Sequence, residues 1–319
     1  MRFKFLLPRS GPWDIVCFVM KPGNKSVGPS GAWDSSGRER APYQDLYIYM
    51  VEGALDETQA SGLGDDFIGN WVEGDSSFLF FSAPSTDSVT SLLGRVMGHR
   101  LTDEFHFTYA QWQGGGLRPL RIPPFLIVPP WVRETEKTEE IRILLDPGVV
   151  FGNGLHPTTR HCLEALVRAR EKSPLGRVLD LGTGTGILAL GAAALGAKNV
   201  HALDLNPLCV RTARRNVQLN GFEEKIRVTE GRAEDAFSLV SDLTLANIHH
   251  EVALGFLEGR SFRAGERIVI SGQMRSQVRD LEGRLRGGGF RVLEEWDHEM
   301  TWYTVLAEKR QVGPRQEIQ

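Results

Sequence analysis

The pattern of hydrophobic and polar positions differs between the two halves of the chain. Between residues 45 and 116, short apolar runs are separated by turn residues in the order strand, helix, strand, strand, helix, strand. This order predicts a ferredoxin-like α+β unit. We expect its strands at residues 46–51, 67–72, 78–82 and 105–112, and its helices at residues 55–61 and 85–97, the second capped by Ser85 or Thr86.

From residue 141 onward, apolar strands alternate with longer amphipathic helices. Such alternation, ending in an antiparallel hairpin, predicts a doubly wound α/β sheet. The expected helices are 158–171, one following the glycines to Leu195, 207–219 and 278–285. The expected strands are 178–181, 199–203, 226–229, 243–246 and 267–271, and the hairpin strands are 290–294 and 301–308.

The remaining segments suggest how the chain is divided. Residues 1–44 are irregular and rich in Gly, Ser and Pro, and we expect them to form a loop or flexible insertion. Residues 117–140 contain an apolar run between paired prolines, which we interpret as a rigid linker. The predicted parts are therefore a small α+β domain at 45–116, the linker at 117–140, a larger α/β domain at 141–311 and a tail at 312–319.

Composition narrows the class of protein. The chain has 319 residues, 41% hydrophobic and 24% charged, with a net charge of -3, so no general attraction to nucleic acid or anionic membrane is expected. It lacks an apolar run long enough to span a bilayer and shows no secretory signal, so we expect a cytoplasmic protein. Its three cysteines, Cys17, Cys162 and Cys209, form no metal motif and are interpreted as reduced, packed thiols.

The strand at 178–181 leads into a glycine-rich turn that carries the candidate chemistry. Its spacing is G-x-G-x-G rather than the G-x-G-x-x-G of dinucleotide sites, and Asp180 adjoins it. A carboxylate there would repel a pyrophosphate but attract the ammonium of S-adenosylmethionine, so we predict this cofactor rather than NAD. A turn that serves only packing is the alternative interpretation. The residues expected to border the cofactor are Asp180, Gly182, Thr183, Gly184 and Gly186.

A second carboxylate follows at the distance expected for a ribose ligand. The next strand ends at Asp204, about 20 residues after the glycines, where such a group binds ribose hydroxyls. Its side chain could equally cap the helix that starts near Pro207. Ala233 or the neighbouring Glu234 is a candidate for touching the adenine, with a plain surface loop as the alternative. Leu205, which follows Asp204, is a further candidate for contact with the cofactor.

Two further motifs lie beside these strands. Residues 151–159 combine glycines, Phe151 and His156 before a Thr-rich helix start, which favours a lid over the methyl donor or simply a helix cap. After the fourth strand, Asn247 offers both a donor and an acceptor that could orient an amine nucleophile. His156, His249 or His250 could accept a proton, or could be plain loop residues. Adjacent histidines alone do not make a zinc site, so no metal is predicted.

These motifs resemble those of the PrmA-type ribosomal protein methyltransferases, which modify protein L11 of the large ribosomal subunit. The resemblance extends from about Ile122 to the end of the chain, and residues 151–159 are its most specific part. It implies a Rossmann-like class I methyltransferase sheet and a small amino-terminal ferredoxin-like domain that captures the substrate protein. It also implies contacts with S-adenosylmethionine from Thr159, Gly182, Asp204 and Asn247. We add Phe151 and Gly152 as candidate cofactor contacts, because they lie in the same motif as Thr159.

The chain departs from the family pattern on the presumed substrate side. The pattern has Thr where this chain has Asn153 and Leu155, and an apolar-small pair where it has His249-His250. We expect a protein N-methyltransferase acting on lysine or α-amino groups of a ribosomal protein, with Asn247, His156 and His249 as candidate catalytic residues. A methyltransferase of another protein or a small amine is the first alternative, and an inactive cofactor-binding protein is the second. A nucleic-acid methyltransferase is a weaker third, because the chain lacks a basic excess and an Asn-Pro-Pro-aromatic motif.

Overall fold

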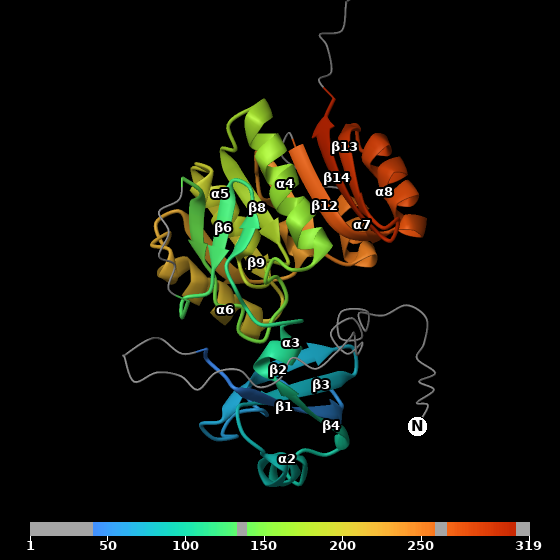
Figure 1. Ribbon diagram of the computed structural model, residues 1–319. Coiled ribbons are helices and arrows are strands. Elements are labelled where there is room, and N and C mark those ends of the chain that lie inside the picture. Colours follow the sequence, from blue (N-terminus) through green and yellow to red (C-terminus); the bar gives the residue numbers. More distant parts are fainter. Residues whose placement is uncertain (1–40, 133–138, 259–266, 311–319) are drawn as a thin grey trace, which may run out of the picture. The chain divides into compact units, whose positions relative to one another are not determined.

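The computed structural model describes residues 41–132, 139–258 and 267–310 (Figure 1). The chain divides into two compact units, Met1–Leu117 and Arg118–Gln319, and each is described here by itself. The tail expected at 312–319, most of the expected amino-terminal segment and Cys17 lie outside the described residues.

The first unit is built on a four-stranded antiparallel sheet in the order β2-β3-β1-β4. This order and pairing are those of a ferredoxin-like unit. Its side chains on one face pack against α2 in an apolar core that includes Tyr49, Leu79, Phe81 and Val89. The elements are β1 (Asp45–Glu52), β2 (Phe67–Glu73), β3 (Ser76–Phe81), α2 (Thr86–Leu93), β4 (Arg100–Thr108) and α3 (Tyr109–Trp112).

The first helix predicted for this unit, at residues 55–61, is wrong. Asp56 and Gln59 exchange side-chain to backbone hydrogen bonds across a single turn, and the chain then leaves the helical region at Gly62, whose φ is +78°. The second helix is shorter than predicted and ends before Gly94. Ser85 lies at its cap position, but its side chain makes no capping hydrogen bond, and Thr86 already belongs to the helix. The last strand ends at Thr108, whose side chain caps α3.

The second unit contains a seven-stranded sheet in the order β10-β9-β8-β11-β12-β14-β13. The first five strands in this order are parallel, while β14 pairs antiparallel with both β12 and β13. The predicted Rossmann-like sheet with a terminal antiparallel hairpin is therefore confirmed. Its strands are β8 (Arg177–Leu181), β9 (Asn199–Asp204), β10 (Ile226–Glu230), β11 (Leu243–Asn247), β12 (Arg267–Met274), β13 (Phe290–His298) and β14 (Trp302–Lys309).

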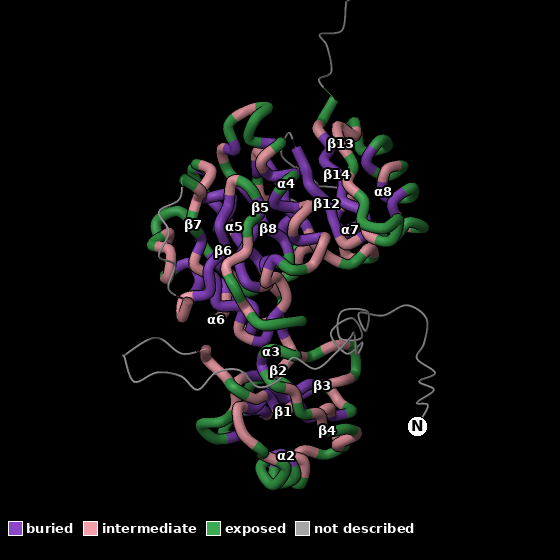
Figure 2. Tube along the Cα trace, in the orientation of Figure 1, coloured by how far each residue is buried: buried purple, intermediate pink, exposed green. Residues whose placement is uncertain are grey.

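Helices cover both faces of this sheet because successive strand residues point to opposite sides. Val269 of β12 belongs to the apolar cluster formed with α4 and α5, whereas Ile268 and Ile270 belong to the cluster formed with α7 and α8. The central strands are consequently buried along most of their length (Figure 2). The helices are α4 (Pro157–Lys172), α5 (Ile187–Ala194), α6 (Pro207–Leu219), α7 (His250–Glu258) and α8 (Arg275–Gly287), with a 3-10 turn η1 at Ala233–Ser238.

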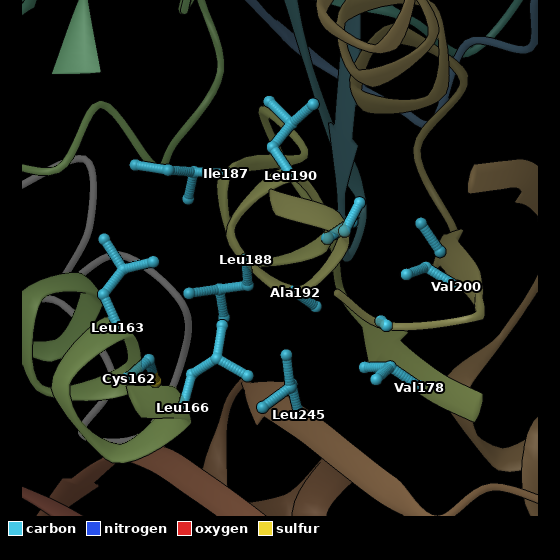
Figure 3. Close-up of a cluster of buried hydrophobic side chains, with 14 of the residues drawn as sticks. Cys162, Leu163, Leu166, Val178, Ile187, Leu188, Leu190, Ala192, Val200 and Leu245 are labelled. Atoms are coloured by element: carbon cyan, nitrogen blue, oxygen red, sulfur yellow. The ribbon is translucent and has the colours of Figure 1, made fainter. Parts of the chain in front are cut away.

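The small residues of α5 allow close packing at the centre of this unit. Leu163 and Leu166 of α4 lie against Leu188 of α5, over Val178 and Leu245 of the sheet (Figure 3). Gly191 packs tightly against α4, because an added Cβ would lie 3.0 Å from a methyl group of Leu163, which would have to shift. This packing fixes α4 and α5 on the strand that leads into the glycine turn.

The apolar run expected to form a rigid connector lies instead in the core of the second unit. Residues Leu120–Ile122 (β5) and Phe125–Val128 (β6) form a hairpin, and Ile141–Leu144 (β7) pairs in parallel with β6. All four residues of β6 are buried, because a continuous apolar run is the pattern of a strand covered on both faces.

None of the helices among the described residues is both long and apolar enough to cross a bilayer.

Candidate active site

The glycine turn between β8 and α5 is the centre of the site. Gly182, Gly184 and Gly186 have φ angles of +66°, +55° and +84°, a region that favours glycine. A Cβ on Gly182 would lie 2.5 Å from Cγ2 of Ile248, and one on Gly184 would lie 2.6 Å from the carbonyl oxygen of Phe151. Two other segments of the chain therefore pack against the turn where side chains of residues 182 and 184 would lie, so only glycine fits at these positions, and Gly182 is nevertheless exposed.

Asp180 lies fully buried just before this turn. Its Oδ2 accepts hydrogen bonds from the Thr183 hydroxyl, at 2.6 Å, and from the Ala189 amide, at 3.2 Å. Its Oδ1 is buried with no hydrogen-bond partner among the described residues. Burial raises the pKa of Asp180 to about 7, although both hydrogen bonds act in the opposite direction.

Asp204 at the end of β9 is held against the same turn. One of its carboxylate oxygens accepts a hydrogen bond from the Gly184 amide and the other from the Asn206 amide, both at 2.9 Å. Burial raises its pKa, and the hydrogen bonds with backbone amides oppose this shift. The cap of α6 comes from Asn206, whose side chain accepts from Leu208, so the capping role that Asp204 could have had belongs to its neighbour.

The remaining candidates for cofactor contacts follow two neighbouring strands, Leu205 directly after β9 and Ala233 and Glu234 at the start of η1, after β10. Leu205 follows Asp204 and is 63% exposed, which is unusual for a large apolar side chain beside a buried carboxylate. Ala233 begins η1, and the preceding loop is attached to β9 because the Gly231 amide donates to the Asp204 carbonyl at 2.9 Å.

The loop at residues 151–156 lies directly against the glycine turn. The Thr185 amide donates to the Phe151 carbonyl at 3.2 Å, and the Thr185 hydroxyl donates to the Gly152 carbonyl at 2.7 Å. Gly152 has a φ of +110°, and a Cβ there would lie 2.8 Å from the Thr185 hydroxyl oxygen. The structure therefore brings together two motifs that are separated by about thirty residues in the sequence.

A chain of side chains connects this loop to the end of β11. The Thr158 amide donates to His156 Nδ1, so Nδ1 is an acceptor and the neutral ring carries its proton on Nε2. The Thr158 hydroxyl lies 2.7 Å from the same nitrogen and donates to it, while accepting a hydrogen bond from Asn247 Nδ2 at 3.3 Å. Asn247 and His156 are thus joined through one threonine.

His156 is held in an aromatic environment. Its ring makes edge contacts with Phe151 and Trp302, each with centroids 5.4 Å apart. Burial, together with the nearby His298 and His161, lowers the pKa of His156 to about 4. At neutral pH the ring is therefore uncharged.

The sequence of this chain matches the model of a known protein family. A family model described as "Ribosomal protein L11 methyltransferase (PrmA)" matches residues 108–310. The chain belongs to this family. It is 38% identical over 196 residues to a ribosomal protein L11 methyltransferase from Anoxybacillus flavithermus, covering 60% of this chain and 62% of the relative.

Two other relatives give the same picture. A protein of the same name from Geobacillus kaustophilus is 39% identical over 188 residues, covering 58% of this chain and 59% of the relative. The crystal structure of a ribosomal protein L11 methylase from Lactobacillus delbrueckii subsp. bulgaricus is 29% identical with a TM-score of 0.55, covering 61% of this chain and all of that one. The chain thus spans less than two thirds of the length of the two curated relatives.

Within this PrmA-family site, the two adjacent histidines have different surroundings. His249 is exposed before α7, and its carbonyl accepts a hydrogen bond from Ala253. His250 is half-buried, with Nδ1 2.7 Å from Gln273 Oε1 and Nε2 3.5 Å from Asp280. The His250 ring therefore contacts β12 and α8, through Gln273 and Asp280.

Asn216 of α6 is a supporting residue that the sequence motifs do not reveal. It is fully buried, and its Nδ2 donates to the carbonyls of Thr185, at 2.9 Å, and Asp146, at 2.8 Å. Its Oδ1 accepts from the Asp146 amide at 2.9 Å. The only available signal was an Asn on the apolar face of α6, beside Ala213 and Val217.

We predict that Gly182→Ala weakens cofactor binding at least about tenfold, because the new methyl group must displace Ile248 from the turn. Gly221→Ala is the matched control, since Gly221 has a nearly equal φ of +64° but nothing within 4 Å of the added Cβ. Calorimetric titration of both variants separates crowding from backbone strain. Equal losses in the two variants would show that the contact with Ile248 is unimportant.

We also predict a difference in pH dependence between the native chain and Asp180→Asn. Because the pKa of Asp180 rises from 3.8 to about 7 on folding, its contribution to stability is complete below pH 3.8 and is lost as pH rises to about 7. The Asn variant keeps an acceptor for Thr183 and Ala189 but cannot ionise. Its free energy of unfolding, measured with denaturant across this range, should decline less with rising pH than that of the native chain. Parallel curves would contradict the raised pKa.

Proposed function

We propose that this chain is an S-adenosylmethionine-dependent methyltransferase that modifies lysine or α-amino groups of ribosomal protein L11. The observation that carries the proposal is the meeting of the glycine turn, two carboxylates and Asn247 at the carboxyl edge of one parallel sheet. Ligands of open α/β sheets bind at this edge, where the strand order reverses. The family assignment and the names of the relatives support the reaction and the acceptor.

Two unpartnered polar atoms support a fit to the amino-acid end of this cofactor. Thr159 Oγ1, near the start of α4, is buried like Asp180 Oδ1, and neither has a hydrogen-bond partner among the described residues. A buried polar atom without a partner costs free energy, and a ligand ammonium or hydroxyl removes that cost. We assign Asp180 and Thr159 to this end of the cofactor.

The residues around the glycine turn, which we call the cofactor cradle, also fit an adenosine group. Glycines at positions 182 and 184 leave backbone exposed for close approach, and Phe151 and Gly152 close the cradle from the opposite loop. We assign Asp204 to the ribose, and Leu205 and Ala233 to the two sides of the adenine. When bound, S-adenosylmethionine supplies an electrophilic methyl group on a positively charged sulfur.

Asn247 is the residue that we expect to orient the acceptor amine. Because its Nδ2 donates to Thr158, its Oδ1 is the atom left to accept a hydrogen bond from the amine. This bond directs the nitrogen lone pair toward the methyl carbon, and the N–C bond forms as the C–S bond breaks with its electron pair on sulfur. Positioning and exclusion of water then supply most of the rate enhancement.

His156 fits a positioning role better than a proton-accepting one. Its Nδ1 already accepts two hydrogen bonds, and a pKa of about 4 makes it a weak base near neutrality. We therefore assign it to fixing Thr158, and through Thr158 the orientation of Asn247. His249, exposed on the same edge, stays a candidate for the proton path.

The first unit is our candidate for capturing the acceptor protein. The matched family segment begins at residue 108, so β1 to β4 lie almost entirely outside it. Acceptor recognition is thus assigned to the part of the chain least like its relatives. Because ribosomal proteins are modified where ribosomes are made, we also propose that the chain acts in the cytoplasm.

The proposal is tested by transfer of labelled methyl groups to purified ribosomal protein L11 and, separately, to a mixed lysate. We predict label on L11, and at least about a hundredfold lower kcat for Asn247→Ala, a loss far larger than any change in cofactor affinity. Asn199→Ala, an exposed Asn at the opposite end of β9, is the control and should keep full activity. Label on another protein alone would replace the acceptor, and no turnover in the native chain would indicate a binding protein.

A further inference from the structure

His250 has a set of contacts that the proposed reaction does not use. It is the first residue of α7, and its ring lies between β12 and α8. Its Nδ1 is 2.7 Å from Gln273 Oε1, and its Nε2 is 3.5 Å from Asp280 Oδ2. The ring therefore connects the loop that carries Asn247 to a neighbouring strand and helix.

Gln273 continues this connection into the backbone of the loop. Its side chain is completely buried, and its Nε2 donates to the carbonyls of Ile248, at 3.2 Å, and Ser271, at 3.1 Å. Since both amide hydrogens are used in this way, Oε1 accepts and His250 Nδ1 donates. One hydrogen bond thus fixes the orientation of an amide that holds the Ile248 carbonyl.

An irregularity in β12 makes this arrangement possible. The pairing of β12 with β14 shifts register between Ser271 and Gln273, and Gly272 there has a φ of +84°. A Cβ on Gly272 would lie 3.0 Å from the Ile248 carbonyl oxygen and 3.4 Å from Asn247 Oδ1. The bulge therefore brings β12 close beneath the Asn247–Ile248 backbone, as bulges next to active sites often do.

A movement of the Asn247–Ile248 loop would also change the packing around the glycine turn. Ile248 covers Gly182 so closely that an added Cβ would lie 2.5 Å from its methyl group. A displacement of the Ile248 carbonyl consequently changes both the cover of the glycine turn and the position of the adjoining Asn247. These contacts connect His250 to the acceptor side of the site through two residues.

We propose that His250 and Gln273 are positioning residues that hold the Asn247–Ile248 segment against the glycine turn, so that the Asn247 amide faces the acceptor amine. The inference rests on the proposed methyl transfer for its kinetic consequences. Its structural part, the attachment of the loop by the His250–Gln273 hydrogen bond, stands independently of the substrate.

Four variants test the arrangement by kinetics. His250→Ala and Gln273→Leu each remove one side of the bond and should lower kcat about tenfold while leaving the KM for S-adenosylmethionine within about threefold. His250→Asn places an amide donor near the position of Nδ1 and should restore most of kcat. The double variant His250→Ala with Gln273→Leu should be no slower than either single change, because the two residues act as one unit.

His201→Ala is the matched control for general loss of stability. His201 also makes one hydrogen bond of 2.7 Å, to the Thr229 hydroxyl, but between β9 and β10. It should keep its kcat. An equal loss of kcat in this control, or additive losses in the double variant, would overturn the positioning role.

Amide hydrogen exchange gives a measurement that needs no acceptor. In His250→Ala, exchange at residues 248–253 should be faster than in the native chain, and His250→Asn should reverse the change. Unchanged exchange would overturn the inference even if the enzyme is active. If the native chain methylates nothing, the proposed function fails while the exchange result still decides the attachment of the loop.

Discussion

The glycine turn after β8 imposes the constraint on which the rest of the site depends. Two segments from distant parts of the chain approach it so closely that a single added carbon at position 182 or 184 would overlap with Ile248 or with the backbone of Phe151. Gly182 is nevertheless exposed, so a ligand can approach its backbone without a side chain in between. Everything that holds these two segments in place therefore also shapes the cofactor cradle, including the Thr185 hydroxyl, buried Asn216 and the bulge at Gly272.

Buried polar groups determine the arrangement on the acceptor side. The path from His156 through Thr158 to Asn247 fixes the tautomer of the ring and uses the Asn247 amide nitrogen, so the amide oxygen is the atom that we propose to accept a hydrogen bond from the acceptor amine. On the other side of Asn247, Gln273 and His250 hold the following carbonyl. A neutral, aromatic-packed histidine suits this purpose, because a fixed orientation matters more there than proton affinity.

Local patterns were sufficient to predict the parts of the fold in which neighbouring residues determine the structure. The strand before Gly182, the strand that ends at Asp204 and the helix at Pro207–Leu219 all follow from periodicity and turn residues. The helix predicted at 55–61 is wrong, because the hydrogen bonds between Asp56 and Gln59 close a single turn only. The linker predicted at 117–140 is wrong in its apolar part, because an apolar run without a helical or strand period fits a buried strand equally well. The pairs Thr158–Asn247 and Asp146–Asn216 are 89 and 70 residues apart, and no local pattern predicts them.

The central claim is that this cradle binds a positively charged methyl donor rather than a dinucleotide. Calorimetric titration of the native chain with S-adenosylmethionine and with NAD, under one set of conditions, tests this claim most directly. We predict saturable binding of S-adenosylmethionine at one site per chain and no measurable heat with NAD, because Asp180 opposes a pyrophosphate at the turn. Tight binding of NAD with none of S-adenosylmethionine would contradict the account.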